Sequence, residues 1–299
     1  MQSVNRPLAG VLWMLATGLL FVAVTAIVKH VGNGVPAAEA AFLRYVLGLV
    51  FLVPMIRPIL NARLTRRQIG LFSMRGLVHT VAVMLWFFAM TRISISEVTA
   101  MNYLSPIYVT LGAAFFLGER IALRRILAVL AALLGAMIIL RPGFREISPG
   151  HLAMLATAVL FAMGYLIAKQ MADEVSPAVV VGMLSITVTI GLAPFAWAVW
   201  VTPSLVQLFW LSLVACFATA GHLTMTLAFK AAPITVTQPV TFLQLVWATM
   251  LGYFAFGEAV DQWVVLGGGV IMASVSFITW REAVSRRRGI TPTHVATKV

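Results

Sequence analysis

Charged residues are scarce in this chain: of its 299 residues, 21 are Lys or Arg and 9 are Asp or Glu. A soluble domain carries roughly a quarter of its residues as charged side chains. Hydrophobic residues make up 61% of the sequence and fall into long apolar runs, and about 20 such residues in a helix cross a bilayer core of about 30 Å. The chain is therefore expected to be a polytopic membrane protein with no room for a separate soluble domain.

Cysteine is almost absent too, because Cys216 is the single one and lies inside an apolar run. An intramolecular disulfide is excluded, as is a C-x-x-C metal or redox motif. The sequence also lacks an H-E-x-x-H motif, a Gly-rich phosphate loop and paired carboxylates within an apolar run. We expect no cofactor, no metal and no enzymatic activity, with a membrane-embedded enzyme as the least favoured alternative.

The formal net charge of +12 does not indicate nucleic-acid binding, because the basic residues cluster in short loops and tails that flank apolar segments. In lipid each backbone polar group must be satisfied internally, so long apolar runs form helices. The fold class predicted is an all-α integral membrane protein with ten transmembrane helices. The expected spans are 8–29, 37–56, 68–90, 95–117, 121–140, 150–171, 177–201, 205–229, 234–256 and 262–280.

The distribution of Lys and Arg among alternate loops predicts the orientation. With the N-terminus inside, 15 basic residues lie on the cytoplasmic side and 4 on the other side, and a basic excess marks the cytoplasmic face. Both termini are therefore expected in the cytoplasm, with the protein in a bacterial inner membrane. The first apolar run is read as a retained helix, and residues 282–299 as a disordered basic tail.

An internal repeat is present. Residues 10–29 match residues 150–169 at ten of twenty positions, and the match ends by aligning Lys29 with Lys169. A second alignment, of 89–119 with 228–258, is identical at seven of thirty-one positions and ends in a Gly-Glu pair in both copies.

The repeat divides the chain into two five-helix units, 8–141 and 150–281. Because five is odd, the second unit enters the membrane from the opposite face, so the two halves have inverted topology. Such halves permit alternating access, in which each half adopts the conformation of the other.

Several short motifs follow one another along the chain in an order that indicates a family. They are Phe42-Leu43-Arg44-Tyr45, Leu104-Ser105-Pro106-Ile107, Leu117-Gly118-Glu119-Arg120, Arg141-Pro142-Gly143 and Gly257-Glu258. Together with the repeat, they resemble the drug/metabolite transporter superfamily in its EamA-like ten-helix branch, and look most similar to amino-acid exporters of the YddG kind. The resemblance implies an exporter or exchanger of small metabolites, with amino acids, S-adenosylmethionine, vitamins and drugs as known substrate classes. It also implies a central cavity lined by the first, third, fourth, sixth, eighth and ninth helices.

Acidic residues within the membrane are missing, since all nine fall at or beyond the ends of the expected helices. This argues against an Asp/Glu proton relay or an acidic sodium site, and leaves a uniporter, an exchanger or a proton-linked carrier that uses histidine. His79 and His222 lie near the middle of the third and eighth spans. An imidazole there either contacts substrate or makes one interhelical hydrogen bond.

Other intramembrane residues are weighed in the same way. Trp86 follows His79 by two helical turns and is either an aromatic plate beside it or part of the interfacial belt. Lys29 and Lys169 are either symmetric gates or snorkelling side chains, and Arg44 and Arg75 are expected to pair structurally. The candidate substrate-binding residues are His79, Trp86, Asn102, Tyr103, Tyr165, Lys169, His222 and Gln244.

The function predicted from all of this is secondary transport. The expected substrate is a small polar metabolite, an amino acid and in particular an aromatic one, exported or exchanged by alternating access. A passive channel and a lipid flippase subunit remain alternatives. The expected partners are a small-molecule substrate and the lipid bilayer, with no nucleic acid, and the chain is either a monomer or a homodimer that uses the small-residue faces of the fifth and tenth spans.

Overall fold

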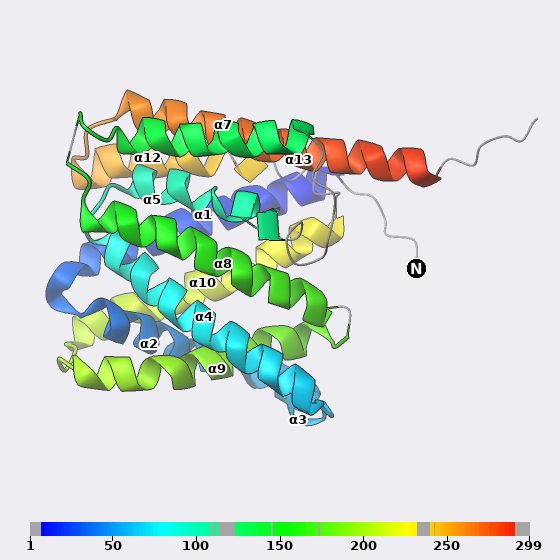
Figure 1. Cartoon of the computed structure of the whole chain (residues 1–299). Coiled ribbons are helices and arrows are strands. Elements are labelled where there is room, and N and C mark those ends of the chain that lie inside the picture. The colour runs from blue at the N-terminus through cyan, green and yellow to red at the C-terminus, as the bar shows by residue number, and fades with distance from the viewer. Residues whose placement is uncertain are drawn as a thin grey trace, which may run out of the picture.

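The computed structural model describes residues 7–108, 111–112, 123–144, 146–172, 174–231, 240–241 and 243–290, and this part contains helices and no β-strand. The bundle is elongated, with most helices running along its length (Figure 1). The helices are α1 (Pro7–Val31), α2 (Ala37–Gly48), α3 (Ile56–Leu60), α4 (Arg66–Met90), α5 (Ile95–Asn102), α7 (Leu123–Leu140), α8 (Pro149–Ala172), α9 (Pro177–Ala198), α10 (Leu205–Ala231), α12 (Leu243–Phe256) and α13 (Gln262–Ile290).

Six helices are long and apolar enough to cross a membrane, and they lie in α1, α4, α8, α9, α10 and α13. Two shorter apolar helices, Ile126–Leu140 and Leu243–Phe256, fall where the fifth and ninth spans were expected. The fourth and ninth expected spans lie only partly within the described residues. The chain is thus a multi-pass membrane protein.

The second expected span, 37–56, is not one continuous α-helix. α2 ends at Gly48, a 3₁₀ segment runs from Leu49 to Met55, and α3 follows. Pro54 is the penultimate residue of the 3₁₀ segment. Proline supplies no backbone N–H and clashes with the preceding helical turn, which accounts for the break.

The last helix extends beyond its expected end. α13 continues to Ile290, whereas the sequence placed the start of the tail at residue 282. Residues 291–299 lie outside the described part of the chain.

Local sequence signals begin several helices. Thr65 and Gln68 form a capping box at the start of α4, and Ser94 and Glu97 form another at the start of α5. In each box two backbone N–H groups that have no partner within the helix are satisfied by side chains. α9 starts with Pro177, a residue suited to the first helical position.

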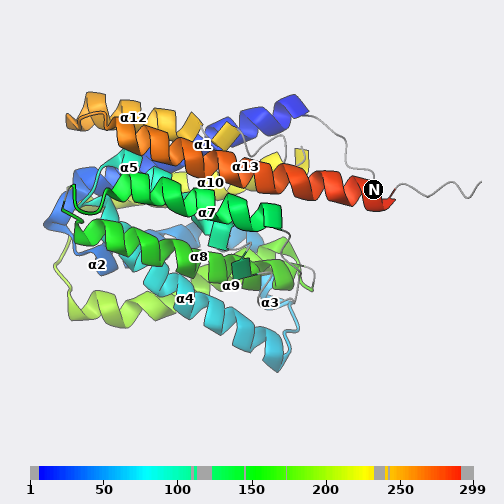
Figure 2. The same cartoon turned by 45° about the horizontal axis from the view of Figure 1, so that its top comes forward.

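The helix pairs follow the internal repeat, which relates α1 to α8, α2 to α9, α4 to α10, α5 to α12 and α7 to α13. α1 packs on α10, and the repeat converts this pair into α8 on α4, which also pack together. The pairs α2–α9, α5–α12 and α7–α13 convert into themselves, and all three are in contact. Figure 2 shows α13 crossing beside α7. The two halves are therefore interleaved about a pseudo-two-fold axis.

The two halves cross the bundle in opposite senses. Near the end of α1, Lys29 Nζ donates a hydrogen bond to the Ile93 carbonyl oxygen at 2.7 Å. At the start of α8, His151 Nε2 lies 3.1 Å from Glu97 Oε1. Residues 93 and 97 are only four positions apart, so α1 ends on the face where its repeat partner α8 begins. Figure 1 shows the two helices running in opposite directions. We call this face the Glu97 end.

The opposite face, which we call the Glu174 end, carries a smaller polar contact. Glu174 accepts hydrogen bonds from Arg67 Nη1 at 2.8 Å and from Gln68 Nε2 at 3.0 Å. The hydrogen bonds from Arg67 and then Gln68 hold the pKa of the Glu174 carboxyl below its ordinary value. The group is exposed, so the pairing contributes little to stability.

Candidate functional site

An aromatic cluster forms where α4 packs against α8. The ring of Phe161 lies 5.0 Å from His79, 6.1 Å from Trp86 and 6.3 Å from Tyr165, measured between ring centroids. His79 and Trp86 share one face of α4, and Phe161 and Tyr165 share one face of α8, because spacings of seven and four residues return to the same side of a helix. We call these four residues the Phe161 cluster.

α2 adds polar and charged groups to this cluster. His79 Nε2 lies 3.0 Å from the Tyr45 hydroxyl, within hydrogen-bond distance. The neighbouring Arg44 places its guanidinium carbon 4.4 Å from the centre of the Tyr45 ring. Arg75 Nη1, on α4, donates to the Val180 carbonyl oxygen of α9 at 3.1 Å.

Burial differs sharply along the cluster. Phe161 is only 8% exposed, and Ala158 on the same stripe of α8 is fully buried. Tyr165, one turn further toward the Glu174 end, is 46% exposed. Protein atoms therefore cover the cluster less at Tyr165 than at Phe161 and Ala158.

His222 completes this region from α10. It is exposed, and its ring packs edge-on against Phe21 of α1 with centroids 5.2 Å apart. Of the helices that carry these residues, α1, α4, α8 and α10 are ones that the resemblance implies for the cavity lining, whereas α2 is not.

The remaining candidates form a second group on α5 and α12. The Tyr103 hydroxyl donates to the Thr241 carbonyl oxygen at 2.8 Å. Asn102 Oδ1 is buried and accepts no hydrogen bond from the described residues. Gln244 lies against α1, since a β-carbon added at Gly18 would lie 3.5 Å from the β-carbon of Gln244. Tyr103 thereby connects the end of α5 to the segment just before α12.

The two predicted lysines have different outcomes. The side chain of Lys169 lies outside the described part of the structure. Lys29 does not extend to the surface in the way that snorkelling implies, because its Nζ pairs with Glu258 Oε1 at 2.5 Å in addition to its bond to Ile93. It belongs to a polar group at the Glu97 end.

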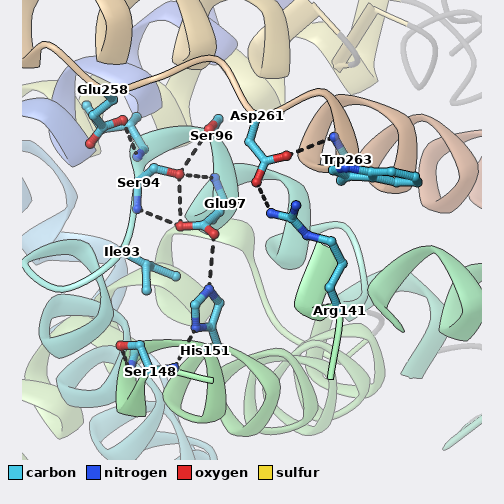
Figure 3. Close-up of polar contacts among 12 residues, drawn as sticks. Ile93, Ser94, Ser96, Glu97, Arg141, Ser148, His151, Glu258, Asp261 and Trp263 are labelled. Carbon is cyan, nitrogen blue, oxygen red and sulfur yellow. Dashed lines mark hydrogen bonds and ion pairs between the residues drawn. The ribbon is translucent and has the colours of Figure 1, made fainter. Parts of the chain in front are cut away.

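This polar group links both halves (Figure 3). Glu97 Oε2 accepts from the Ser94 backbone N–H at 2.8 Å and from its hydroxyl at 2.9 Å, while Oε1 contacts His151. Glu258 Oε2 accepts from the Ile95 N–H at 3.0 Å. Arg141 forms an ion pair with Asp261, just before α13. The Glu97 end is therefore bound together by charges contributed by α1, α5, α8 and the segments next to α7 and α13.

Sequence reasoning missed several of these residues. Phe161 lies within an apolar run and carries no signal that separates a site residue from a packing residue. Arg75 pairs with a helix carbonyl as expected, but Arg44 donates no hydrogen bond to the described residues. An arginine within a membrane span is by itself a signal of a functional site. Arg44 was not predicted as a site residue because it was expected to pair structurally.

The fold and this site define a class. The chain is a multi-pass membrane protein whose two repeats run in opposite senses, and its interior holds aromatic and basic side chains from several helices. Such an arrangement is typical of a membrane carrier whose binding site lies between two repeats.

The comparison with protein families agrees with this class and narrows it. The model of the EamA-like transporter family matches residues 8–141 and again residues 148–280. The chain belongs to this family, as the motifs and the repeat predicted, and it is a membrane transporter of a small metabolite.

Its relatives carry different substrates. The riboflavin transporter of Vibrio cholerae serotype O1 is 27% identical over 290 residues, which cover 95% of this chain and 97% of that protein. The S-adenosylmethionine uptake transporter of Rickettsia conorii is 26% identical, covering 94% and 96%. The pseudopaline exporter of Pseudomonas aeruginosa strain UCBPP-PA14 is 24% identical, covering 89% and 94%. A solved crystal structure with 20% identity superposes with a TM-score of 0.61 over 94% of this chain and 99% of that one, which supports the fold.

Proposed function

We propose that this transporter carries a small metabolite with a planar aromatic group, an aromatic amino acid among them, by alternating access through a central cavity between its two halves. The observation that carries the proposal is the Phe161 cluster, whose aromatic rings come from two helices and whose Tyr165 is 46% exposed. Aromatic faces with a few polar anchors suit an amphipathic ligand of this size.

The packing of the halves supports the alternating-access part of the proposal. The pairs α1–α10 and α4–α8 are equivalent under the repeat, and the cluster lies where α4 packs on α8. If the two pairs exchange conformations, access to the cluster from the Glu174 end closes and access from the Glu97 end opens. The polar contacts at the Glu97 end would then have to separate during each cycle.

The relatives are consistent with a ring-bearing substrate without fixing which one. Riboflavin and S-adenosylmethionine, named for two of them, both contain a planar heteroaromatic ring system. The relatives include both uptake and export proteins, so export or exchange of an amino acid by this chain belongs to the proposal.

Counterflow in proteoliposomes tests the proposal and its two rivals. Vesicles preloaded with unlabelled L-phenylalanine, or with riboflavin, are expected to take up the corresponding labelled compound faster than empty vesicles. The reason is that a carrier with bound substrate returns to the outward-facing state faster than an empty one. Equal rates in loaded and empty vesicles point to a passive channel and contradict the proposal. Movement of a fluorescent lipid between leaflets, in place of solute uptake, assigns the chain to lipid transport instead.

Removing the central ring of the cluster should slow this transport. Phe161→Ala is expected to lower the counterflow rate at subsaturating substrate by about tenfold or more, since aromatic contacts of about 0.5–1.5 kcal/mol each are lost together with buried area. Phe161→Leu keeps most of the volume and separates loss of the ring from a cavity. Phe195→Ala, on the exposed face of α9, is the matched control. Equal rates in all three variants would remove the cluster from the site.

Orientation is the remaining part of the proposal: the chain lies in a bacterial inner membrane with both termini in the cytoplasm. In a Cys216→Ala background, an impermeant maleimide added to intact cells should label Phe144→Cys, a position that is 93% exposed beyond the Glu97 end. Asn61→Cys, in the loop before α4, should react only after lysis. The reverse labelling pattern places the termini outside.

A further inference from the structure

Arg44 and Arg75 are two cations inside the bundle that have no acidic partner among the described residues. Their exposed fractions are 7% and 8%. Neither forms an ion pair with a carboxylate in the described part of the chain. Glu39, also on α2, is fully buried, but its Oε2 accepts the Val201 backbone N–H at 2.9 Å and it forms no bridge to Arg44.

This arrangement is unfavourable for the protein alone. A single charge near the middle of a bilayer raises the free energy by at least about 2.5 kcal/mol on insertion scales, and buried charges are normally paired. Here two like charges lie on the contacting helices α2 and α4. A negative charge brought by a ligand would lower this energy.

The guanidinium groups also have donors to spare. Each arginine carries five N–H groups in a fixed planar fork. Arg75 gives one donor to Val180, whereas Arg44 stacks on the Tyr45 ring without donating a hydrogen bond to any described residue. The Nε atoms of both are buried and unpartnered among the described residues. Such forks match the two oxygens of a carboxylate.

The position of the two arginines fits a particular substrate. Arg44 adjoins Tyr45, whose hydroxyl contacts His79, and His79 stacks on Phe161. The basic groups and the aromatic plates are therefore connected by direct contacts. A ligand with a ring at one end and an anion at the other reaches both.

We propose that Arg44 and Arg75 together bind the carboxylate of an aromatic substrate whose ring lies on the Phe161 cluster, so that the transporter selects aryl carboxylates over the corresponding neutral or cationic compounds. The inference rests on the proposed function, because it uses the same site and adds the charge of the substrate. No carboxylate is expected within the membrane, so the source of charge selectivity in this inference is the pair of arginines.

Binding of three matched probes to the purified full chain tests this directly by calorimetry. They are 3-phenylpropanoate, 3-phenylpropanol and 3-phenylpropylamine, which share the ring and differ in charge. The unmodified protein is expected to bind the acid about 10- to 100-fold more tightly than the alcohol, the range for charge-assisted hydrogen bonds, and to bind the amine least. Equal affinity for acid and alcohol, or preference for the amine, overturns the inference without recourse to any variant.

Variants then locate the effect. Arg44→Gln and Arg75→Gln are expected to reduce the preference for the acid by about 10- to 100-fold while leaving the affinity for the alcohol unchanged. Arg44→Lys keeps the charge without the fork and should fall between. Arg92→Gln is the matched control, because Arg92 also stacks on an aromatic ring, that of Phe88 at 3.6 Å, but is exposed at the Glu97 end. An unchanged preference in folded Arg44→Gln protein overturns the assignment to this residue pair.

The outcome for the inference is separable from that for the proposed function. Counterflow of neutral riboflavin with no preference for the acid probe leaves the carrier function intact and removes the anion site. Acid-selective binding that depends on the two arginines, without counterflow of any solute, retains the anion site and removes the carrier mechanism.

Discussion

Glu97→Ala is expected to lower the free energy of unfolding by about 3–5 kcal/mol, the range for removing one member of a buried ion or hydrogen-bond pair. Glu97 and His151 are both buried, with side-chain exposures of 9% and 5%. The Ser148 N–H donates to His151 Nδ1 at 3.1 Å, so Nε2 carries the proton and donates to Glu97. The substitution removes the carboxylate that accepts this hydrogen bond.

The same carboxylate also begins α5. Glu97 is the third residue of the helix, and its carboxylate accepts a hydrogen bond from the Ser94 N–H. In turn the Ser94 hydroxyl accepts from the Glu97 N–H at 3.1 Å. Loss of such a cap alone costs about 1 kcal/mol. Glu97→Gln keeps an oxygen acceptor for Ser94 and should therefore lose less than Glu97→Ala.

Thermal unfolding in detergent, followed with and without His151→Ala, measures this effect. The double variant should be less destabilised than the sum of the single variants, because each single change leaves one partner unsatisfied. Glu146→Ala, in the exposed segment before α8, is the control for loss of a carboxylate. An unfolding midpoint for Glu97→Ala equal to that of Glu146→Ala would show that the pair contributes nothing.

The second large effect is expected at Gly135, where α7 and α13 approach most closely. A β-carbon there would lie 2.7 Å from the carbonyl oxygen of Gly267 and 2.8 Å from Ile271 Cγ1. A backbone oxygen cannot rotate away as a flexible side chain can, so the two helices must separate. Overpacking of this kind costs about 1–3 kcal/mol.

Gly135→Ala should therefore lower the midpoint of thermal unfolding, although alanine favours a helix by about 1 kcal/mol over glycine. Gly70→Ala on α4 is the matched control, since a β-carbon there meets nothing within 4 Å. That variant should be neutral or slightly stabilised. If Gly135→Ala were stabilised to the same extent as Gly70→Ala, the close approach of α7 and α13 would be contradicted.

These two regions support the site without forming it. α7 and α13 pack on each other through Gly135 and Gly267 and lie apart from the Phe161 cluster on α4 and α8. The contacts of Glu97 join helices at the Glu97 end, whereas Tyr165 lies toward the Glu174 end of α8. The stability variants therefore test the scaffold, and the variants of Phe161 and Arg44 test binding.

Several features of the site follow from the sequence because they are local. His79 and Trp86 are seven residues apart, so any helix at this position puts them on one face. The reversal of the halves follows from an odd number of spans and the match of residues 10–29 with 150–169. The break after Gly48 was missed, although Pro54 marked it, because hydropathy averages over a window longer than the 3₁₀ segment.

Other features depend on partners far apart in the chain. Phe161 joins His79 from another helix, and its own surroundings in sequence are those of any packing residue. Arg44 was expected to find a carbonyl or carboxylate, and its unpaired guanidinium became evident only when the neighbours on α4 and α9 were placed around it.

The sequence by itself determined that the chain is a duplicated membrane transporter of the EamA-like family. Its apolar segments are recognisable without tertiary contacts, because transfer of an apolar segment into lipid depends on that segment alone. Only the tertiary structure decided which side chains share the interior and which charges stay unpaired there. The reason is physical: contacts such as His79 with Phe161, or Glu97 with His151, depend on how helices pack, and in lipid that packing is selected by shape and polar complementarity and not by hydropathy.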